Sequence, residues 1–286
     1  MIRLLKSIIY NFYINFKFKK IIHKHDKITT DKTDSVEFQE LFDNGSILIE
    51  NFLNIESIEN FKVDFQWITS KKSTRKVFPT VIKKNSLPHQ IISNNQLNKL
   101  IKSYIGENAR LDSIEIQKIE ENSDNESLSE KWHYDNVGRR IKVFYFLNDC
   151  RNIYTQYLNK TNNISHNSYS IKSSRISEKK IQKYKKNLMN FYPKKNSLLI
   201  IDTNGYHRGV YRNNLNNDKK NYREMIVFEY SDIKKSEDFY GLTNIIGPRF
   251  TYFDTKINLD ETLIEKKYIF NFGDFYKYDL EYSKYF

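Results

Sequence analysis

The stretch from Trp132 to Asp149 reads WHYDNVGRRIKVFYFLND. It joins a histidine and an aspartate two residues apart, His133 and Asp135, to a strongly β-prone run over 141–147. Residues i and i+2 of a strand point to the same face, so the imidazole and the carboxylate can reach one ion. The turn-forming pair Asn148-Asp149 closes the run.

A second histidine follows an apolar strand further along the chain. Residues 196–213 read NSLLIIDTNGYHRGVYRN, in which SLLII predicts a buried strand that leads to His207. A His-x-Asp tripeptide alone is weak, because it occurs by chance on many protein surfaces. Two histidines and one carboxylate with open positions, however, form the facial triad that selects non-haem Fe(II). We therefore predict that His133, Asp135 and His207 are metal ligands.

Arg223 lies sixteen residues after His207, across a predicted hairpin whose return strand covers 224–230. A 2-oxo acid can chelate a metal through its keto oxygen and one carboxylate oxygen, and its far carboxylate then needs a cation. A guanidinium matches that carboxylate with two parallel hydrogen bonds. The hairpin predicts that Arg223 reaches the cavity that His207 faces; the alternative is a surface arginine in a basic protein.

Composition indicates a folded protein with a large aromatic core. The chain has 286 residues, 39% of them hydrophobic, with 20 Phe and 21 Tyr. Cys150 is the only cysteine, which excludes an intramolecular disulfide and a cysteine-based zinc site and fits a cytoplasmic, reducing compartment. The net charge of +12 comes from basic residues dispersed along the chain, which we interpret as solubilising. Binding to nucleic acid is the alternative, and no nucleic-acid-recognition signature supports it.

The N-terminal residues 1–24 predict a basic amphipathic helix. Its apolar centre is too short and too interrupted to cross a membrane, and no signal-peptide cleavage site follows it. Two interpretations stay open, a helix docked on the domain and a helix lying on an anionic membrane surface. Beyond it, short strands with turn signals, and helices predicted over 96–105 and 177–190, favour an antiparallel barrel or sandwich with helical flanks.

Taken together, the motifs resemble the phytanoyl-CoA dioxygenase-like branch of the Fe(II)/2-oxoglutarate-dependent oxygenases. The His-x-Asp, the distal histidine and the following arginine match in order and spacing, and NGSILIENFLNIESIENFKVDF over 44–65 is similar to the family's entry strand and helix. The resemblance covers residues 37–232. It implies a mainly β fold with flanking helices, the double-stranded β-helix or cupin-like jelly roll, with Fe(II) held by the triad, 2-oxoglutarate anchored by Arg223, and O2 as the oxidant.

The resemblance also indicates which other residues contact the cosubstrate or the substrate. Lys142 and Tyr145 are candidates for 2-oxoglutarate, but they do not share one strand face, so at most one of them is expected to reach it. Trp132 is a candidate pocket wall, with a core aromatic as the alternative. Asn204 and Arg208 flank the distal histidine and are candidate substrate contacts, with solvent exposure as the alternative for Arg208.

The activity implied by the resemblance is oxidative decarboxylation of 2-oxoglutarate to succinate and CO2, coupled to hydroxylation of a small molecule or of a lipid- or carrier-linked metabolite. Family members that halogenate lack the carboxylate that Asp135 supplies, which favours hydroxylation. Between 152 and 190 the chain departs from the family pattern, in the part that shapes the substrate pocket, so no particular substrate is implied. A non-catalytic jelly-roll protein that binds metal or ligand is the alternative function.

The domain organisation expected from these observations has three parts. Residues 1–30 form the basic amphipathic segment, residues 31–235 form the dioxygenase domain, and residues 236–286 form an extension that packs on the domain. The expected location is cytoplasmic, with peripheral contact to a membrane through residues 1–24 as the open alternative. No nucleic-acid partner is expected.

Overall fold

A computed structural model describes most of the predicted catalytic domain and three short strands beyond it. The described residues are 35–54, 75–79, 87–106, 109–120, 128–135, 140–162, 175–211, 222–232, 251–253, 255–256 and 268–270. The amphipathic segment over 1–24, the helix expected after Asn54 and the turn over 213–221 lie outside these residues. Within the described residues, no helix combines the length and the apolar character that crossing a membrane requires.

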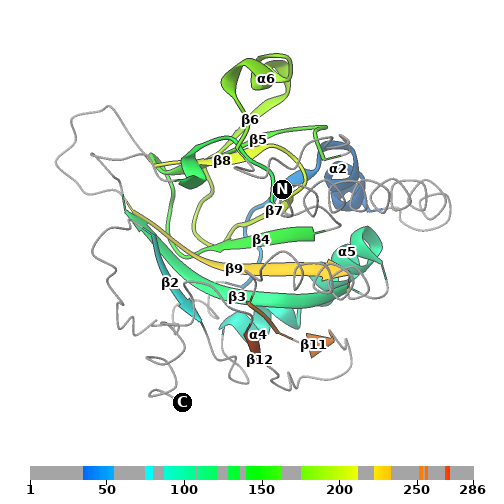
Figure 1. The fold of residues 1–286 in the computed structure, drawn as a ribbon. Coiled ribbons are helices and arrows are strands. Elements are labelled where there is room, and N and C mark those ends of the chain that lie inside the picture. Colours follow the sequence, from blue (N-terminus) through cyan, green and yellow to red (C-terminus); the bar gives the residue numbers. More distant parts are fainter. Residues whose placement is uncertain are drawn as a thin grey trace, which may run out of the picture.

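Two antiparallel sheets face each other and form the body of the protein (Figure 1). The larger sheet has the strand order β1-β7-β4-β9-β3-β11, with β2 also paired to β3, and the smaller sheet has the order β6-β5-β8. The strands β10 and β12 form a separate two-stranded sheet. The strands are β1 (Ser46–Ile49), β2 (Arg75–Pro79), β3 (Ala109–Glu120), β4 (Arg140–Phe146), β5 (Tyr154–Leu158), β6 (Leu188–Phe191), β7 (Leu198–Asp202), β8 (His207–Val210), β9 (Tyr222–Asp232), β10 (Thr251–Phe253), β11 (Thr255–Lys256) and β12 (Tyr268–Phe270).

The order in which the chain visits the two sheets is that of a jelly roll. The segment at His133 joins the smaller sheet, because His133 forms antiparallel bridges with His207 and with Arg175. The chain then runs through β4 in the larger sheet, β5 and β6 in the smaller, β7 in the larger, β8 in the smaller and β9 in the larger. This alternation builds a double-stranded β-helix, which confirms the predicted fold class.

Two well-capped helices, α2 (Val36–Asn44) and α5 (Asn95–Ile105), accompany the larger sheet. The Ser35 hydroxyl accepts from the Phe38 N–H at 3.2 Å, and the Asn94 side chain accepts from the Leu97 N–H at 3.0 Å, as N-caps do. At the C-terminus of α2, Gly45 takes a φ of 78°, in the left-handed region that favours glycine. The prediction of a helix over 96–105 is confirmed.

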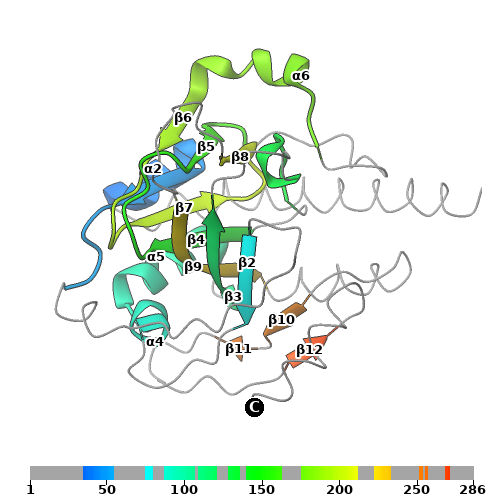
Figure 2. The same cartoon turned by 90° about the vertical axis from the view of Figure 1, so that its left-hand side faces the viewer.

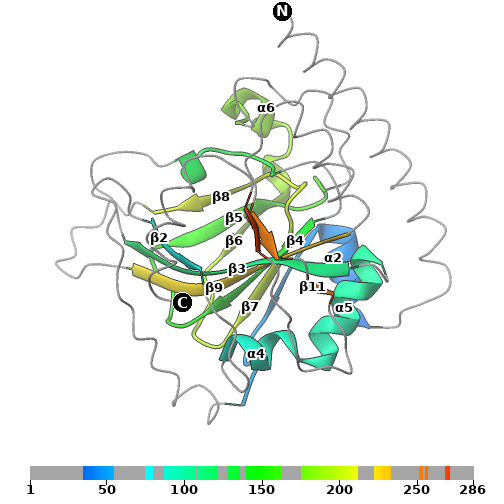
Figure 3. The same cartoon turned by 60° about the horizontal axis from the view of Figure 1, so that its bottom comes forward.

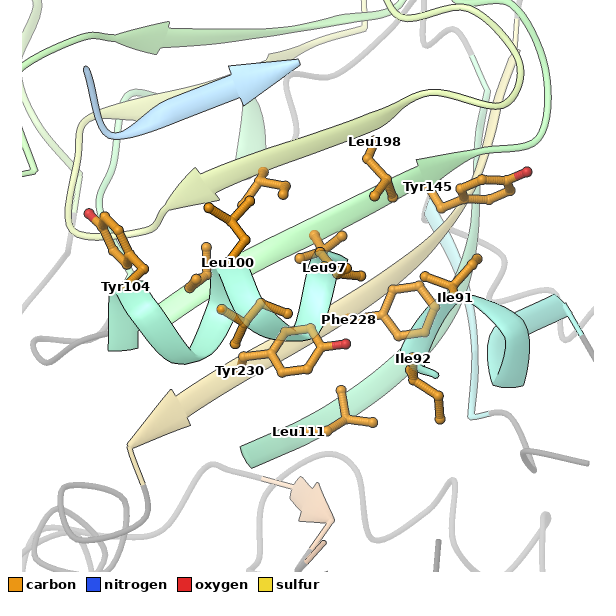
Figure 4. Packing of buried hydrophobic residues seen from close by; sticks show 14 of the residues in the cluster. Ile91, Ile92, Leu97, Leu100, Tyr104, Leu111, Tyr145, Leu198, Phe228 and Tyr230 are labelled. Atoms are coloured by element: carbon orange, nitrogen blue, oxygen red, sulfur yellow. The ribbon is translucent and has the colours of Figure 1, made fainter. Parts of the chain in front are cut away.

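The apolar face of α5 packs against the outer face of the larger sheet (Figures 3 and 4). Leu97 and Ile101 of the helix share one buried cluster with Val143 of β4 and Phe228 of β9. Residues 141, 143 and 145 of β4 all point into this cluster, so residues 142, 144 and 146 point between the two sheets. The strand alternation of β4 therefore decides which of its side chains face the interior.

The opposite side of the molecule is covered by α6 (Glu178–Gln182), which lies over the smaller sheet (Figure 2). The helix predicted over 177–190 was too long: after a short 3-10 turn over Lys185–Asn187, residues Leu188–Phe191 form β6 and pair with β5. Helix α4 (Leu87–Ile92) leads into α5, and a 3-10 turn, η1, covers Leu128–Glu130. The hydrogen bonds of the β5–β6 ladder outweigh the local helical pattern at 188–190.

Candidate metal centre

The structure brings the three predicted ligands close together. His133, Asp135 and His207 each offer a ligand atom, and these atoms all lie within 4.8 Å of one another. The Nε2 atoms of His133 and His207 lie 3.8 and 3.9 Å from the Asp135 carboxylate, and the two imidazole centroids are 4.3 Å apart. Both histidines are buried, and the aspartate is half-buried.

Backbone carbonyls hold both imidazoles in the orientation that a metal site needs. The Nδ1 atom of His133 lies 2.7 Å from the carbonyl oxygen of Lys131, and the Nδ1 atom of His207 lies 2.9 Å from that of Gly205. A carbonyl oxygen only accepts, so each Nδ1 carries the proton and each Nε2 keeps its lone pair. The two lone pairs and the carboxylate are the donor set of a facial triad, and this set fits Fe(II).

Burial keeps the two imidazoles neutral. Burial, with a smaller contribution from the neighbouring His207, lowers the pKa of His133 to about 3. The pKa of His207 is also lowered, chiefly by burial. At Asp135, burial alone would raise the pKa, but the charge and hydrogen bond of Lys142, together with His207 and His133, outweigh it and hold the pKa well below its usual range. The site therefore presents neutral imidazoles and an ionised carboxylate at neutral pH.

Lys142 and Glu229 extend the site by a buried ion network. The Lys142 Nζ atom lies 2.5 Å from Asp135 Oδ2 and 3.1 Å from Glu229 Oε1, and Arg140 Nη2 lies 2.6 Å from Glu229 Oε2. Burial alone would lower the pKa of Lys142, but the two carboxylates raise it. Of the two candidates on β4, Lys142 therefore faces the site, where it contacts the candidate ligand Asp135.

Arg223 lies in the same interior, on the inner face of β9. Its side chain is 3% exposed, and its Nη1 donates to the Thr155 hydroxyl at 3.0 Å. Its guanidinium carbon lies 5.4 Å from the centre of the Tyr211 ring. Within the described residues no carboxylate pairs with this guanidinium, and its Nε–H is buried without an acceptor. A buried arginine without a counter-ion is expensive, and an anionic ligand would satisfy it.

The strand register shows how far the Thr155 hydroxyl, which binds Arg223, lies from His207. Tyr157 pairs with His207 and Thr155 pairs with Gly209 across β5 and β8. Two residues of a strand span about 7 Å, so the Thr155 hydroxyl that holds Arg223 lies about that far along the sheet from His207. This separation suits a short dicarboxylate with one end at the metal and the other at Arg223.

Four other predicted contacts are placed elsewhere. Tyr145 points into the cluster under α5, and its hydroxyl donates to Asn196 at 3.1 Å, so it does not face the triad (Figure 4). Trp132 packs on the outer face of the smaller sheet with Tyr206, as the core-aromatic alternative expected. Strand alternation is the reason in both cases. Tyr145 lies three residues after the inward-facing Lys142, and Trp132 lies one residue before the inward-facing His133, so both point the other way.

Asn204 and Arg208, the two candidates near His207 in the sequence, make structural contacts away from the triad. Asn204 is buried, and its backbone N–H and side-chain amide both donate to Asp202 Oδ1, at 2.9 and 2.8 Å, closing the turn between β7 and β8. Arg208 points to the outer face, where it lies 4.7 Å from the centre of the Trp132 ring and donates to Gln156 at 2.6 Å. The structure therefore does not bring the three substrate candidates Trp132, Asn204 and Arg208 to the metal site.

Sequence reasoning missed Glu229, Thr155 and Arg175. Arg175 bridges to His133, and the backbone N–H of Ile176 donates to the Trp132 carbonyl at 2.8 Å, so an additional segment flanks the triad. The positive charge of Arg175 contributes to lowering the pKa of both imidazoles. Of the three, only Glu229 had a signal in the sequence: strand alternation over 223–229 puts it on the same face as Arg223.

Comparison with known proteins gave matches among solved structures alone. No protein-family model matches the sequence, and a search of curated proteins found no match. The chain is similar to HygX from Streptomyces hygroscopicus, crystallised with nickel, 2-oxoglutarate and hygromycin B, at 12% identity and a TM-score of 0.48, over 70% of this chain and 88% of HygX. It is also similar to SnoN, a non-haem alpha-ketoglutarate-dependent epimerase from nogalamycin biosynthesis, at 10% identity and a TM-score of 0.48, over 68% and 82% of the two chains.

A third similar structure is EvdMO1, at 12% identity and a TM-score of 0.45, over 69% of this chain and 49% of EvdMO1. At these identities and TM-scores the likeness carries no argument about activity. The function proposed below rests on the geometry of the site.

Proposed function

We propose that the protein is an Fe(II)- and 2-oxoglutarate-dependent oxygenase that hydroxylates a small molecule or a lipid- or carrier-linked metabolite and releases succinate and CO2. One observation carries the proposal. A single interior holds a His-Asp-His set with both Nε2 lone pairs available and a buried arginine without a carboxylate partner among the described residues, bound to a Thr155 hydroxyl about 7 Å along the sheet from His207. Metal ligands with open positions and a separate carboxylate anchor are the two requirements of a chelating 2-oxo acid.

Each residue has a defined task in this scheme. His133, Asp135 and His207 hold the metal, and Arg223 with the Thr155 hydroxyl binds the far carboxylate of 2-oxoglutarate. Fe(II), when bound, supplies the reaction with O2, which no side chain of the protein can perform. The apolar interior of the jelly roll keeps water from the reacting atoms.

The finer assignments are proposals of the same kind. The order and spacing of the His-x-Asp, the distal histidine and the arginine support a place in the phytanoyl-CoA dioxygenase-like branch. The carboxylate of Asp135 supports hydroxylation, because it occupies the position that a halide takes in halogenating members of the family.

We propose the domain boundaries and the location on similar grounds. The pairing of β11 with β3, Thr255 opposite Leu111, supports an extension over 236–286 that packs on a catalytic domain over 31–235. The single cysteine supports a cytoplasmic location, and the basic apolar stripe over 1–24 supports peripheral contact with an anionic membrane.

Succinate formation tests the proposed activity. Purified protein supplied with Fe(II), ascorbate, O2 and 2-oxoglutarate should release succinate slowly even without a substrate, and Co(II) should bind at one site per chain. His133→Ala, Asp135→Ala and His207→Ala should each abolish both signals, because each removes one of three ligands. Asp149→Ala is a matched control, since Asp149 is an exposed aspartate whose carboxylate accepts from the Lys195 N–H at 2.9 Å.

Two outcomes would contradict the proposal. The first is a His207→Ala variant that binds Co(II) as the wild type does, which would remove the distal ligand from the site. The second is triad-dependent binding of Co(II) and 2-oxoglutarate without succinate release under any condition, which would identify a binding protein with the same fold.

A further inference from the structure

A lysine in contact with a metal-ligand carboxylate is the feature of the site that the proposed function does not explain. Lys142 and Glu229 lie directly opposite each other on β4 and β9, and both side chains point between the sheets. The Lys142 ammonium lies 2.5 Å from Asp135 Oδ2 and 3.1 Å from Glu229 Oε1. On its other side, Glu229 binds Arg140 at 2.6 Å. Four charges of alternating sign thus connect the metal ligand to the larger sheet.

Electrostatics alone gives no reason for this lysine. A positive charge beside the site repels a divalent cation, and burying the network costs desolvation of every member. The side chains of Lys142, Asp135 and Glu229 are only 18–20% exposed, so solvent screens these charges weakly. A site selected for metal affinity alone would have an uncharged hydrogen-bond donor to Asp135 in place of Lys142. The geometry of the contact is therefore the property to explain.

The contact discriminates between the two oxygens of Asp135. Each oxygen lies near one imidazole, Oδ1 at 3.8 Å from Nε2 of His133 and Oδ2 at 3.9 Å from Nε2 of His207, but Lys142 binds Oδ2. An ammonium has three N–H donors, and Glu229 fixes one of them at 3.1 Å. The lysine is thereby held by the sheet, and it holds Oδ2 in turn.

We propose that Lys142 and Glu229 are a positioning pair that restricts Asp135 to one metal-binding oxygen. This inference rests on the proposed function. Three single-atom protein ligands leave three positions of an octahedron, two for 2-oxoglutarate and one for O2. A carboxylate free to bind through both oxygens would take one of those positions. Occupying Oδ2 with a lysine prevents this, at the expense of some metal affinity.

The sign of the effects separates positioning from plain electrostatics. If charge alone mattered, Lys142→Met would strengthen metal binding and Glu229→Gln would weaken it, because the two variants remove opposite charges. If the pair positions Asp135, both variants release the carboxylate and change the site in the same direction. Lys118→Met is the matched control, because Lys118 pairs with Glu224 at 3.4 Å, with both side chains 20% exposed, on strands β3 and β9 of the same sheet.

The test is a titration of the purified full chain with Co(II), followed by visible absorption, and then with 2-oxoglutarate. Lys142→Met should shift the Co(II) spectrum toward a higher coordination number. It should also weaken 2-oxoglutarate binding to the Co(II) form by about ten- to hundredfold, the range for loss of one charge-assisted hydrogen bond. Glu229→Gln should move both readouts in the same direction by a smaller factor, and Lys118→Met should match the wild type.

A wild-type Co(II) spectrum and wild-type 2-oxoglutarate affinity in Lys142→Met would overturn the positioning role. Opposite shifts of Co(II) affinity in the two variants, with unchanged spectra, would overturn it as well. If Lys142→Met does not fold, Glu229→Gln serves as the second variant, because it keeps the size of the side chain and its Co(II) spectrum tests the same expected shift. Wild-type protein that binds Co(II) through the triad but not 2-oxoglutarate would contradict the proposed function, while the Co(II) spectra would still decide the role of Lys142.

Discussion

Replacing Arg223 with leucine is the sharpest test of the cosubstrate anchor. The arginine is 3% exposed, donates to Thr155 and lies against Tyr211 in an otherwise apolar interior. Leucine suits the apolar neighbours Phe146 and Met225 and leaves no buried charge behind. The variant is therefore expected to fold and to keep its metal ligands in place.

The expected loss follows from the bonds that a guanidinium forms. Two parallel charge-assisted hydrogen bonds to a carboxylate contribute about 1.5–3 kcal/mol each, or about 3–6 kcal/mol together. Since about 1.4 kcal/mol is a tenfold change in an equilibrium constant, Arg223→Leu should weaken 2-oxoglutarate binding by roughly a hundred- to ten-thousandfold. Arg223→Lys keeps the charge but not the two-pronged geometry, so its loss should be roughly ten- to hundredfold.

The assay is calorimetric titration of the Co(II)-loaded protein with 2-oxoglutarate, with the Co(II) affinity measured first on the same preparation. Co(II) affinity should stay within a factor of about three, because Arg223 does not contact the triad in any described interaction. Arg208→Leu is the matched control, since Arg208 follows His207 directly but points to the outer face of the smaller sheet. It should bind 2-oxoglutarate as the wild type does.

An Arg223→Leu variant with an intact Co(II) site and wild-type affinity for 2-oxoglutarate would refute the reasoning. Equal losses in Arg223→Leu and Arg208→Leu would also refute it, because they would indicate a general effect of arginine removal.

Two further predictions concern the packing and the pH dependence of the site. Gly209→Ala places a methyl group 2.4 Å from the Tyr211 ring, so the ring must shift, and this ring lies against Arg223; the KM for 2-oxoglutarate should rise about tenfold in succinate assays while Co(II) affinity is unchanged, and an unchanged KM would contradict this packing. The pKa of His133 is lowered to about 3 and that of His207 is lowered as well, so from pH 6.5 downward the unfolded chain binds protons that the folded chain does not. Urea denaturation of the metal-free protein should therefore show stability falling with pH below about 6.5, by up to about 1.4 kcal/mol per pH unit for each imidazole, and a flat profile between pH 6.5 and 5 would contradict their burial as neutral groups.

Much of the larger sheet was predictable because its strands carry strong local patterns. The run over 141–147 is observed as Arg140–Phe146, and SLLII is observed as Leu198–Asp202. The smaller sheet was harder. The strands Tyr154–Leu158 and Leu188–Phe191 mix polar and apolar residues, and each becomes a strand by pairing with the other some thirty residues away.

The candidate site likewise has parts that local sequence predicts and parts that depend on strand pairing. The spacing of His133 and Asp135, the apolar strand before His207 and the hairpin that leads to Arg223 are local features, so the sequence by itself determined the candidate ligands and the candidate cosubstrate anchor. Which residues surround them depends on strand register, because a shift of one residue moves every side chain to the other face. The tertiary structure alone therefore decided that Tyr145 packs under α5.

The contact between Lys142 and Asp135 was decided in the same way. It joins Lys142 of β4 to Asp135 in the segment before that strand, and Glu229 reaches it only through the pairing of β4 with β9. Local propensity contains no information on such a pairing, since its free energy comes from groups that lie 87 positions apart in the chain and meet only after folding. The sequence by itself thus determined which groups can bind the metal, and tertiary structure decided which group holds them in place.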